Sequence, residues 1–176
     1  MRVVELGGGL FDPLDRADGR IGEVCFVIHR PGGRLLTAIN TYYPAGAYRL
    51  PTGGIKAGES VLEALRRETR EETSLETKVG RFLVAVAYRR DGAHAFVTLA
   101  FLLDEIGGTL ANADPAEQHG AFGETDVAGL EGIARRLETL PEGYDPRIRG
   151  SWRDWGRFRA VIHRLVRDAL DARDEG

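Results

Sequence analysis

The apolar positions of the chain predict many strands and few helices. Stretches rich in β-branched and aromatic residues, bounded by turn formers, are typical of strands. The turn "PGG" predicts a hairpin of the second and third strands, and Asp91-Gly92 predicts another hairpin between the two longest strands. The predicted strands cover residues 2–6, 23–30, 34–40, a short segment that ends at Pro51, 76–90, 93–105 and 121–125.

Helical patterns occur in the middle of the chain and toward its end. The central helix is predicted from Ser60 to Thr73, where Ser60 is a good N-cap and Glu63 completes a capping box. Further helices are predicted from a cap at Asp126 to about Leu140 and over residues 151–171.

Neither repeats nor an obvious linker interrupt this order of elements. Residues 1–176 are therefore predicted to form a single α+β domain. Of these residues, 43% are apolar and 29% are charged, which is ordinary for a folded soluble protein. The net charge of −3 gives no electrostatic reason to expect binding to nucleic acid or to a membrane surface.

Location and redox state can also be predicted from the sequence. No stretch reaches the ~20 apolar residues that a membrane span needs, and the first residues do not resemble a signal peptide, so we expect a cytoplasmic protein. The one cysteine, Cys25, lies in the apolar run "VCFVI". A thiol in such a strand is expected to fill the core rather than to act as a nucleophile.

The segment "RRETREETS" (66–74) gives the central helix an unusual charge pattern. At about 100° per residue with Glu68 at zero, Glu72 falls near about 40° and Glu71 near about 300°. Leu65 falls within the same wedge, at about 60°. The carboxylates therefore border the apolar face, whereas the acids of a solvated helix would lie opposite the buried stripe.

Convergent glutamates at this spacing repel one another unless a cation offsets their charge. Oxygen-donor side chains gathered at one edge of a helix suit a hard divalent cation, most naturally Mg²⁺. The geometry favours a metal site over a salt-bridged surface helix, which remains the alternative reading of the same residues.

Residues before the helix extend the pattern. Gly53 is followed by five residues and Glu59, and then by seven residues and "RETREETSL". This arrangement resembles the Nudix box, G-x5-E-x7-R-E-U-x-E-E-x-G-U, in which U is a bulky aliphatic residue. Thr69 stands where U is expected, and Ser74 stands where the glycine is expected. The matching positions are Gly53, Glu59, Arg67, Glu68, Glu71, Glu72 and Leu75.

The resemblance implies a mixed β-sheet sandwiched by helices, and a hydrolase for nucleoside diphosphates linked to another group. It implies that Glu68, Glu71 and Glu72 hold Mg²⁺, or alternatively Mn²⁺, with help from a backbone carbonyl of Gly53 or Gly54. Attack by water on a diphosphate needs such cations, because they neutralise the phosphate oxygens and lower the pKa of bound water.

The resemblance also implies roles for neighbouring residues. Arg67 and Glu59 would brace the loop against the helix as an ion pair. The general base would be Glu71, Glu72 or, on a later loop, Glu117, with Glu124 and His119 as weaker candidates.

The two departures from the box affect shape rather than chemistry. Thr69 keeps a β-branched volume, and its hydroxyl can bond back to the helix. Ser74 lacks the conformational freedom of glycine, so we expect a helix exit of different construction.

Residues that bind substrate are harder to predict. Tyr48 and Arg49, just before the box, are candidates, while Tyr42 and Tyr43 could stack on a base or pack their loop. His163 is expected to be a packed or surface histidine. A basic run near the C-terminus is expected to be a solvated face, with a phosphate contact or the edge of a homodimer as alternatives; it consists of Arg147, Arg149, Arg153 and Arg157.

Substrate signatures outside the box do not decide among subfamilies. The proline that marks many ADP-ribose pyrophosphatases downstream of the box is absent, since that region reads "YRRDGA". The expected substrate is therefore a generic nucleotide or nucleotide-sugar diphosphate. Two alternatives use the same fold: a regulatory module that binds nucleotides without turnover, and an isopentenyl-diphosphate isomerase, which needs a catalytic cysteine in a polar pocket.

Overall fold

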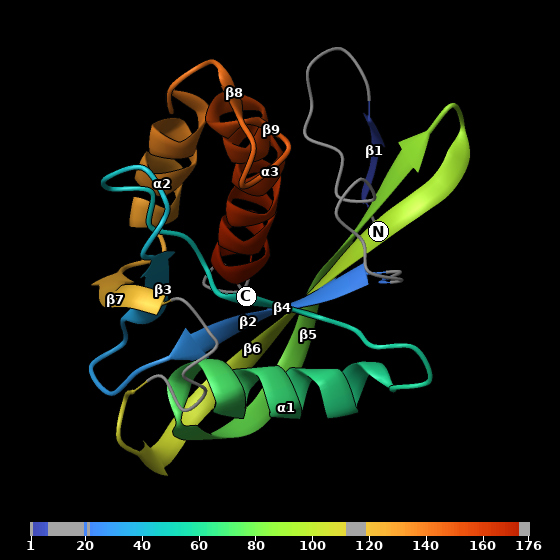
Figure 1. Ribbon diagram of the computed structural model, residues 1–176. Helices are drawn as coiled ribbons and strands as arrows, with labels where there is room; N and C mark the ends of the chain where they lie inside the picture. The colour runs from blue at the N-terminus through green and yellow to red at the C-terminus, as the bar shows by residue number, and fades with distance from the viewer. Residues whose placement is uncertain (1, 7–19, 21, 112–118, 173–176) are drawn as a thin grey trace.

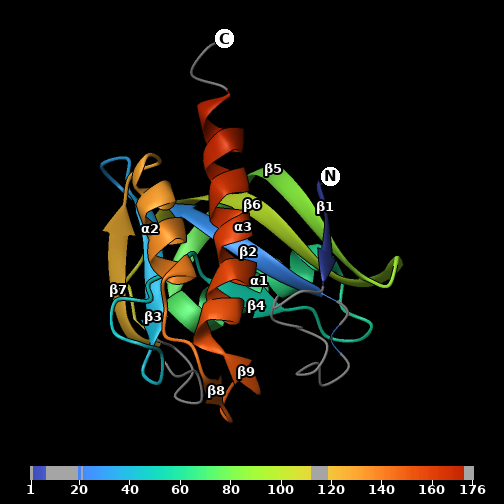
Figure 2. The same cartoon turned by 90° about the horizontal axis from the view of Figure 1, so that it is seen from above.

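A computed structural model describes residues 2–6, 20, 22–111 and 119–172 of the chain. A mixed β-sheet separates one helix, α1 (Val61–Thr73), from two others, α2 (Gly129–Glu138) and α3 (Trp152–Asp171) (Figure 1). Seen from above, α2 and α3 lie side by side over the sheet (Figure 2). This arrangement confirms the predicted α+β sandwich. Within the described part of the chain, no helix combines the length and apolarity needed to cross a membrane.

The main sheet has the strand order β1-β5-β6-β2-β3-β7, and β4 pairs with β2 beside that path. β1 is parallel to β5 and β2 is parallel to β6, whereas the other pairs are antiparallel. The strands are β1 (Arg2–Leu6), β2 (Gly22–His29), β3 (Leu35–Asn40), β4 (Thr52–Gly54), β5 (Leu75–Arg90), β6 (Ala93–Gly108) and β7 (His119–Thr125), with β8 (Tyr144–Asp145) and β9 (Gly150–Ser151) forming a separate pair.

Both predicted hairpins are present. Asp91 and Gly92 both adopt positive φ, 52° and 75°, and join β5 to β6 as expected. β2 and β3 are antiparallel neighbours across the predicted turn, with a short ladder in which His29 lies opposite Leu35. β2 also pairs with β6 along its whole length and with β4 near its start, while β3 pairs with β7. These further partners are distant in sequence, so the turn residues do not predict them.

The strand before the box also differs from the prediction. It was expected to end at Pro51, but β4 runs from Thr52 to Gly54. Proline has no N–H for a ladder, and the ladder to β2 begins at Thr52 opposite Cys25. Gly53 lies opposite Val24 and Gly54 opposite Glu23, so both glycines belong to the strand.

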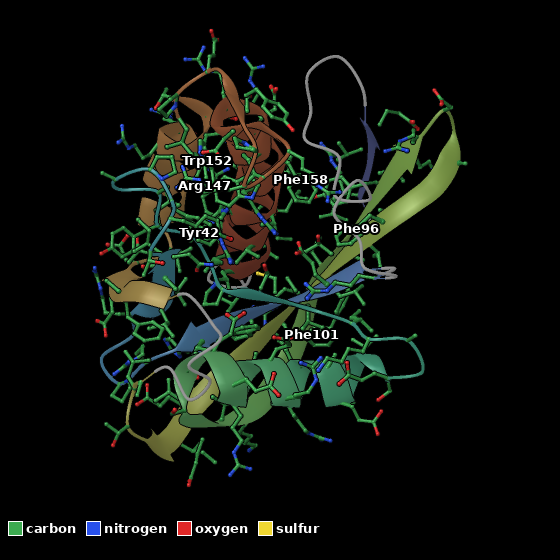
Figure 3. The ribbon with its side chains drawn as sticks, viewed as in Figure 1. Tyr42, Phe96, Phe101, Arg147, Trp152 and Phe158 are labelled. Carbon is green, nitrogen blue, oxygen red and sulfur yellow. The ribbon has the colours of Figure 1, made fainter. Side chains whose placement is uncertain are left out.

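Both faces of β2 are covered, so successive side chains enter different cores. Val24 and Phe26 pack on the α1 side, where Phe101 also lies (Figure 3). Cys25 and Val27 pack on the α3 side. Burial raises the pKa of the Cys25 thiol to about 12, with a smaller contribution from the charge of Glu23. This confirms Cys25 as core and removes the cysteine chemistry of an isomerase.

The ends of α1 explain its boundaries. Ser60 Oγ accepts the Glu63 N–H at 3.3 Å, and Glu63 accepts the Ser60 N–H at 2.9 Å, which confirms the capping box. At the other end, Ser74 adopts the left-handed conformation with φ 57°, and its N–H bonds to the Arg70 carbonyl. The prediction of a different helix exit is therefore wrong, because serine takes the conformation that glycine adopts more easily.

The hydroxyl of Thr69 also behaves differently from the prediction. It is buried and makes no hydrogen bond to any described group. The hydroxyl that bonds back along the helix is that of Thr73, which donates to the Thr69 carbonyl at 2.5 Å. Thr73 Oγ1 also accepts the Leu75 N–H at 3.2 Å, so it supports the left-handed exit into β5.

The last helix is tied to the segment before β4 through a buried histidine. The Leu50 N–H donates to His163 Nε2 at 2.9 Å, and Nδ1 lies 2.8 Å from the Arg159 carbonyl. A carbonyl only accepts, so Nδ1 carries the proton. Burial lowers the pKa of His163 to about 4, which keeps the ring neutral. The expected packed histidine is confirmed.

The remaining boundary difference lies at α2. The helix starts at Gly129, later than the predicted cap at Asp126. Asp126 Oδ1 nevertheless accepts the Gly129 N–H at 2.7 Å, so it caps the turn that leads into the helix.

Replacing Ser74 with glycine should stabilise the protein. A non-glycine residue in the left-handed region costs about 1–2 kcal/mol, partly offset by the larger entropy that glycine loses on folding. We expect Ser74→Gly to raise the free energy of unfolding by about 1 kcal/mol in urea denaturation. The same substitution at the N-cap, Ser60→Gly, should cost a few tenths of a kcal/mol. A destabilised Ser74→Gly would show that the exit is not strained.

Candidate functional site

Arg67, in the middle of α1, reaches back to the loop that precedes the helix. Its Nε and Nη2 donate to the two carboxylate oxygens of Glu59 at 2.7 and 2.8 Å, which is a forked ion pair. Hydrogen bonding to Arg67 lowers the pKa of Glu59 to about 2, and the Lys56 N–H, at 3.1 Å, adds to this effect. The loop end and the helix middle are therefore fixed to one another.

The same guanidinium binds three further groups. Nη2 donates to the Gly54 carbonyl at 3.0 Å, while Nη1 donates to Glu68 Oε1 at 2.7 Å and to Glu71 Oε2 at 3.0 Å. These bonds, led by those to Glu59, raise the pKa of Arg67, so it stays charged. One side chain thus connects β4, the loop and two of the box glutamates.

The three glutamates of the acidic segment differ in exposure. Glu68 and Glu72 are 5% and 4% exposed, while the Glu71 side chain is 37% exposed. A Cβ placed on Gly53 would overlap the Glu68 carboxylate, so Gly53 must be glycine for Glu68 to lie there. The charge of Glu72 contributes to raising the pKa of Arg49. Glu68 and Glu72 therefore lie on the buried side of α1, as predicted.

One backbone carbonyl of β4 is available to bind a cation beside the glutamates of α1. The Pro51 carbonyl and the Ile55 N–H both bond to β2. Backbone N–H and C=O groups alternate in direction along an antiparallel strand, so those of Gly53 also point toward β2, and those of Thr52 and Gly54 point to the open edge. The Gly54 carbonyl accepts from Arg67. The other carbonyl that faces the edge is that of Thr52.

The donor set suits a hard divalent cation even though its oxygens are not gathered around a point. Among the described residues, no three His, Cys, Asp or Glu side chains lie close enough together as placed to hold an ion. Two buried carboxylates on one helix face nevertheless carry charge that burial penalises unless a cation offsets it. Carboxylate and carbonyl oxygens are the ligands that Mg²⁺ prefers.

The two residues expected to bind substrate, Arg49 and Tyr48, lie in different environments. Arg49 is buried and donates to the Leu50 carbonyl, to Thr52 Oγ1 and to the Tyr43 hydroxyl, at 2.9, 3.1 and 3.3 Å. Burial alone would lower the pKa of Arg49, but Tyr43 and Glu72 raise it above its ordinary value. Tyr48 instead lines a cleft of about 420 Å³ between α2 and the β3–β7 edge.

The other loop tyrosines pack their own loop. Tyr43 contacts Trp152 and Trp155 edge-on, with ring centroids 5.4 and 4.8 Å apart. Tyr42 lies beside Trp152 at the start of α3 (Figure 3). This packing favours the structural alternative for both rings. Of the basic run, Arg147 forms an ion pair with Asp145, and Arg153 bonds to the Leu140 carbonyl.

The candidate bases on the later loop receive less support from geometry. Glu117 lies outside the described residues, and only the backbone of His119 is described, as the first residue of β7. Glu124 is exposed, with Oε1 3.6 Å from Arg30 Nε.

A buried acid near the site was not singled out from the sequence. Glu23 is 6% exposed and lies opposite Gly54 in the β2–β4 ladder. Its Oε1 accepts from Arg159 Nη1 at 2.5 Å and from Thr98 Oγ1 at 2.8 Å. An acid inside a predicted strand is the signal that could have revealed it, since buried carboxylates need partners.

Replacing Arg67 with lysine should destabilise the protein, because an ammonium cannot reproduce the fork to Glu59. Charged hydrogen bonds contribute about 1.5–3 kcal/mol each, so we expect Arg67→Lys to lower the free energy of unfolding by at least about 2 kcal/mol. Urea denaturation measures this loss. Exposed Arg66→Lys, one position away, should change it by less than about 0.5 kcal/mol. Equal effects at the two positions would contradict the bracing role.

Comparison with known proteins agrees with this geometry. The NUDIX domain family matches residues 19–142. An ADP-ribose pyrophosphatase of Methanocaldococcus jannaschii is 40% identical over 100 residues, 56% of this chain and 57% of that protein. The NAD-capped RNA hydrolase NudC of Chromobacterium violaceum is 26% identical over 153 residues, 86% of this chain and 47% of that protein. The chain thus matches only about half of the length of these relatives.

A solved structure agrees in fold. The ADP-ribose pyrophosphatase of Streptococcus suis superposes with a TM-score of 0.52 at 17% identity, over 85% of this chain and 90% of that one. The family match includes the whole segment from Gly53 to Leu75. The glycines of β4, the ion pair of Arg67 with Glu59 and the three glutamates of α1 therefore lie inside the shared domain. The chain belongs to the Nudix family.

Proposed function

We propose that residues 1–176 form one Mg²⁺-dependent diphosphatase domain, which hydrolyses the diphosphate linkage of a nucleoside diphosphate joined to a second group. The observation that carries this proposal is the pair of buried glutamates, Glu68 and Glu72, on the α1 face beside the Gly53 backbone. A structural helix gains nothing from burying like charges one turn apart. A metal site requires them.

In this proposal, Glu68, Glu71 and Glu72 hold Mg²⁺ or Mn²⁺, together with the Thr52 backbone carbonyl in place of the Gly53 carbonyl that the sequence suggested, because Gly53 pairs with β2. When bound, the cation would neutralise the phosphate oxygens and lower the pKa of the attacking water. Arg67 and Glu59 keep the loop in register with the helix and do not touch substrate, since their hydrogen bonds are made to one another and to the site.

A carboxylate of the chain must accept the proton of the attacking water. Glu71 is the most exposed of the three box glutamates, and its Oε2 is held by Arg67. Glu72 and Glu117 are the other candidates for the base. Each would act within hydrogen-bonding distance of the water, so replacing the true base should lower kcat. At Glu117, which is not among the proposed cation ligands, the same replacement should leave cation affinity almost unchanged.

The proposed substrates are dinucleotides and nucleotide sugars, beginning with ADP-ribose. The M. jannaschii relative named ADP-ribose pyrophosphatase supports this choice, because its 40% identity extends over 100 residues. The match to a relative named NAD-capped RNA hydrolase adds NAD-capped RNA as a second compound to test. The absence of the usual downstream proline keeps the substrate class broader than ADP-ribose alone.

Turnover should depend on the divalent cation and on the box glutamates. We expect ADP-ribose or another member of a nucleotide-diphosphate panel to be hydrolysed with Mg²⁺ and not after chelation. Glu68→Gln and Glu72→Gln should each lower kcat/KM by at least about a hundred-fold, since several kcal/mol of charge stabilisation are lost. Exposed Glu76→Gln on β5 serves as the control.

Calorimetry with Mn²⁺ separates the enzyme from a non-catalytic module. The proposal predicts that Glu68→Gln and Glu72→Gln weaken Mn²⁺ binding, while Glu76→Gln does not. Nucleotide binding without turnover on any compound of the panel would support the regulatory alternative. Turnover that is indifferent to both variants would contradict the proposed site.

A further inference from the structure

The Arg20 side chain lies against Gly54, at the position that a side chain of residue 54 would occupy. A Cβ on Gly54 would come within 2.6, 2.7 and 2.8 Å of Arg20 Cδ, Nε and Cζ. Real Cβ atoms essentially never make such short contacts, so the guanidinium can lie there only because residue 54 has no side chain. Arg20 is itself exposed to solvent.

Gly53 and Gly54 face side chains of opposite charge, on opposite sides of β4. Successive residues of an extended strand point to opposite sides, and Gly53 faces the Glu68 carboxylate whereas Gly54 faces Arg20. Bond lengths and a Cα spacing of about 3.8 Å place the carboxylate and the guanidinium no more than about 12 Å apart. One nucleoside diphosphate can therefore touch both groups around the open edge of β4, which pairs with β2 alone.

Three other arginines nearby are already engaged. Arg67 is held by Glu59 and two box glutamates, and Arg159 is paired with Glu23 at 2.5 Å. Arg49 is buried among a carbonyl and two hydroxyls. For Arg20, no carboxylate of the described residues lies within ion-pair distance. Its guanidinium, in contact with the place of a Gly54 side chain, can therefore accept an anionic ligand.

We propose that Arg20 binds the diphosphate of the substrate at the face of β4 opposite Glu68, and so determines affinity for the anionic group. This inference rests on the proposed function and deepens it. It also explains why two consecutive glycines are present: Gly53 makes room for the metal-binding carboxylate, and Gly54 makes room for the arginine. A planar guanidinium matches two phosphate oxygens at once, which a lysine cannot do.

The first test measures affinity for inorganic pyrophosphate with Mg²⁺ by calorimetry, and KM for ADP-ribose where it is turned over. Arg20→Met keeps an unbranched apolar stem, removes the guanidinium and should weaken both by roughly ten-fold to a hundred-fold, as expected for lost charged hydrogen bonds. Arg20→Lys should recover part of the affinity. Arg135→Met, on the exposed surface of α2, should change neither quantity.

The second test uses the glycine beneath the arginine. Gly54 has no positive φ, and the atoms that an added Cβ would meet belong to a flexible side chain, so Gly54→Ala should fold and push Arg20 aside. We expect Gly54→Ala to raise KM and the pyrophosphate Kd as Arg20→Met does. The double variant should be no worse than either single one, because both remove the same contact.

Separate outcomes distinguish the two proposals. If the wild type hydrolyses a nucleotide diphosphate with Mg²⁺ but Arg20→Met binds pyrophosphate as tightly as the wild type, the role of Arg20 is wrong and the proposed function stands. If nothing is hydrolysed yet Arg20→Met and Gly54→Ala both weaken pyrophosphate binding, the anion site stands and the activity is wrong. Additive effects of the two substitutions would also contradict the shared contact.

Discussion

The forked ion pair between Arg67 and Glu59 is the contact on which the site depends. It joins the middle of α1 to the end of the loop before it, and the same guanidinium holds the Gly54 carbonyl and two box glutamates. A flexible lysine in this place could make one of these bonds but not the whole set. Because the pair fixes loop and helix together, the extended glycines of β4 lie against the glutamate face of the helix.

The charge of the site follows from this arrangement. Three glutamates of the box, Glu59, Glu68 and Glu71, meet the one arginine, while Glu72 is buried beside them on the same helix. Excess buried negative charge is costly unless a cation accompanies it, and hard oxygen donors select a cation such as Mg²⁺. The face of β4 turned away from α1 has a positive side chain, with Arg20 against Gly54, and the nearby Glu23 is neutralised by Arg159. The proposed ligand, an anion with a diphosphate at its centre, would reach both faces around the edge of β4.

Local rules were sufficient wherever the structure depends on neighbours in sequence. The capping box at Ser60 and the turn at Asp91-Gly92 were predicted for this reason, and helical periodicity placed the glutamates beside the core. Long-range pairing was not predictable in the same way. β2 keeps its predicted hairpin neighbour β3 and also pairs with β6 and β4, and no turn residue predicts those two further partners. Spacing within the box indicated its brace. The substrate candidates Tyr48 and Arg49 lie in different places, because successive residues of an extended segment point to opposite sides.

The proposed cation site on the acidic face of α1 can be observed in a crystal of the protein soaked in millimolar Mn²⁺, with anomalous scattering used to locate the ion. We expect an anomalous peak in contact with carboxylate oxygens of Glu68 and Glu72 and with the Thr52 backbone carbonyl. Electron density with these glutamates ordered and no ion between them and β4 would contradict the proposed site.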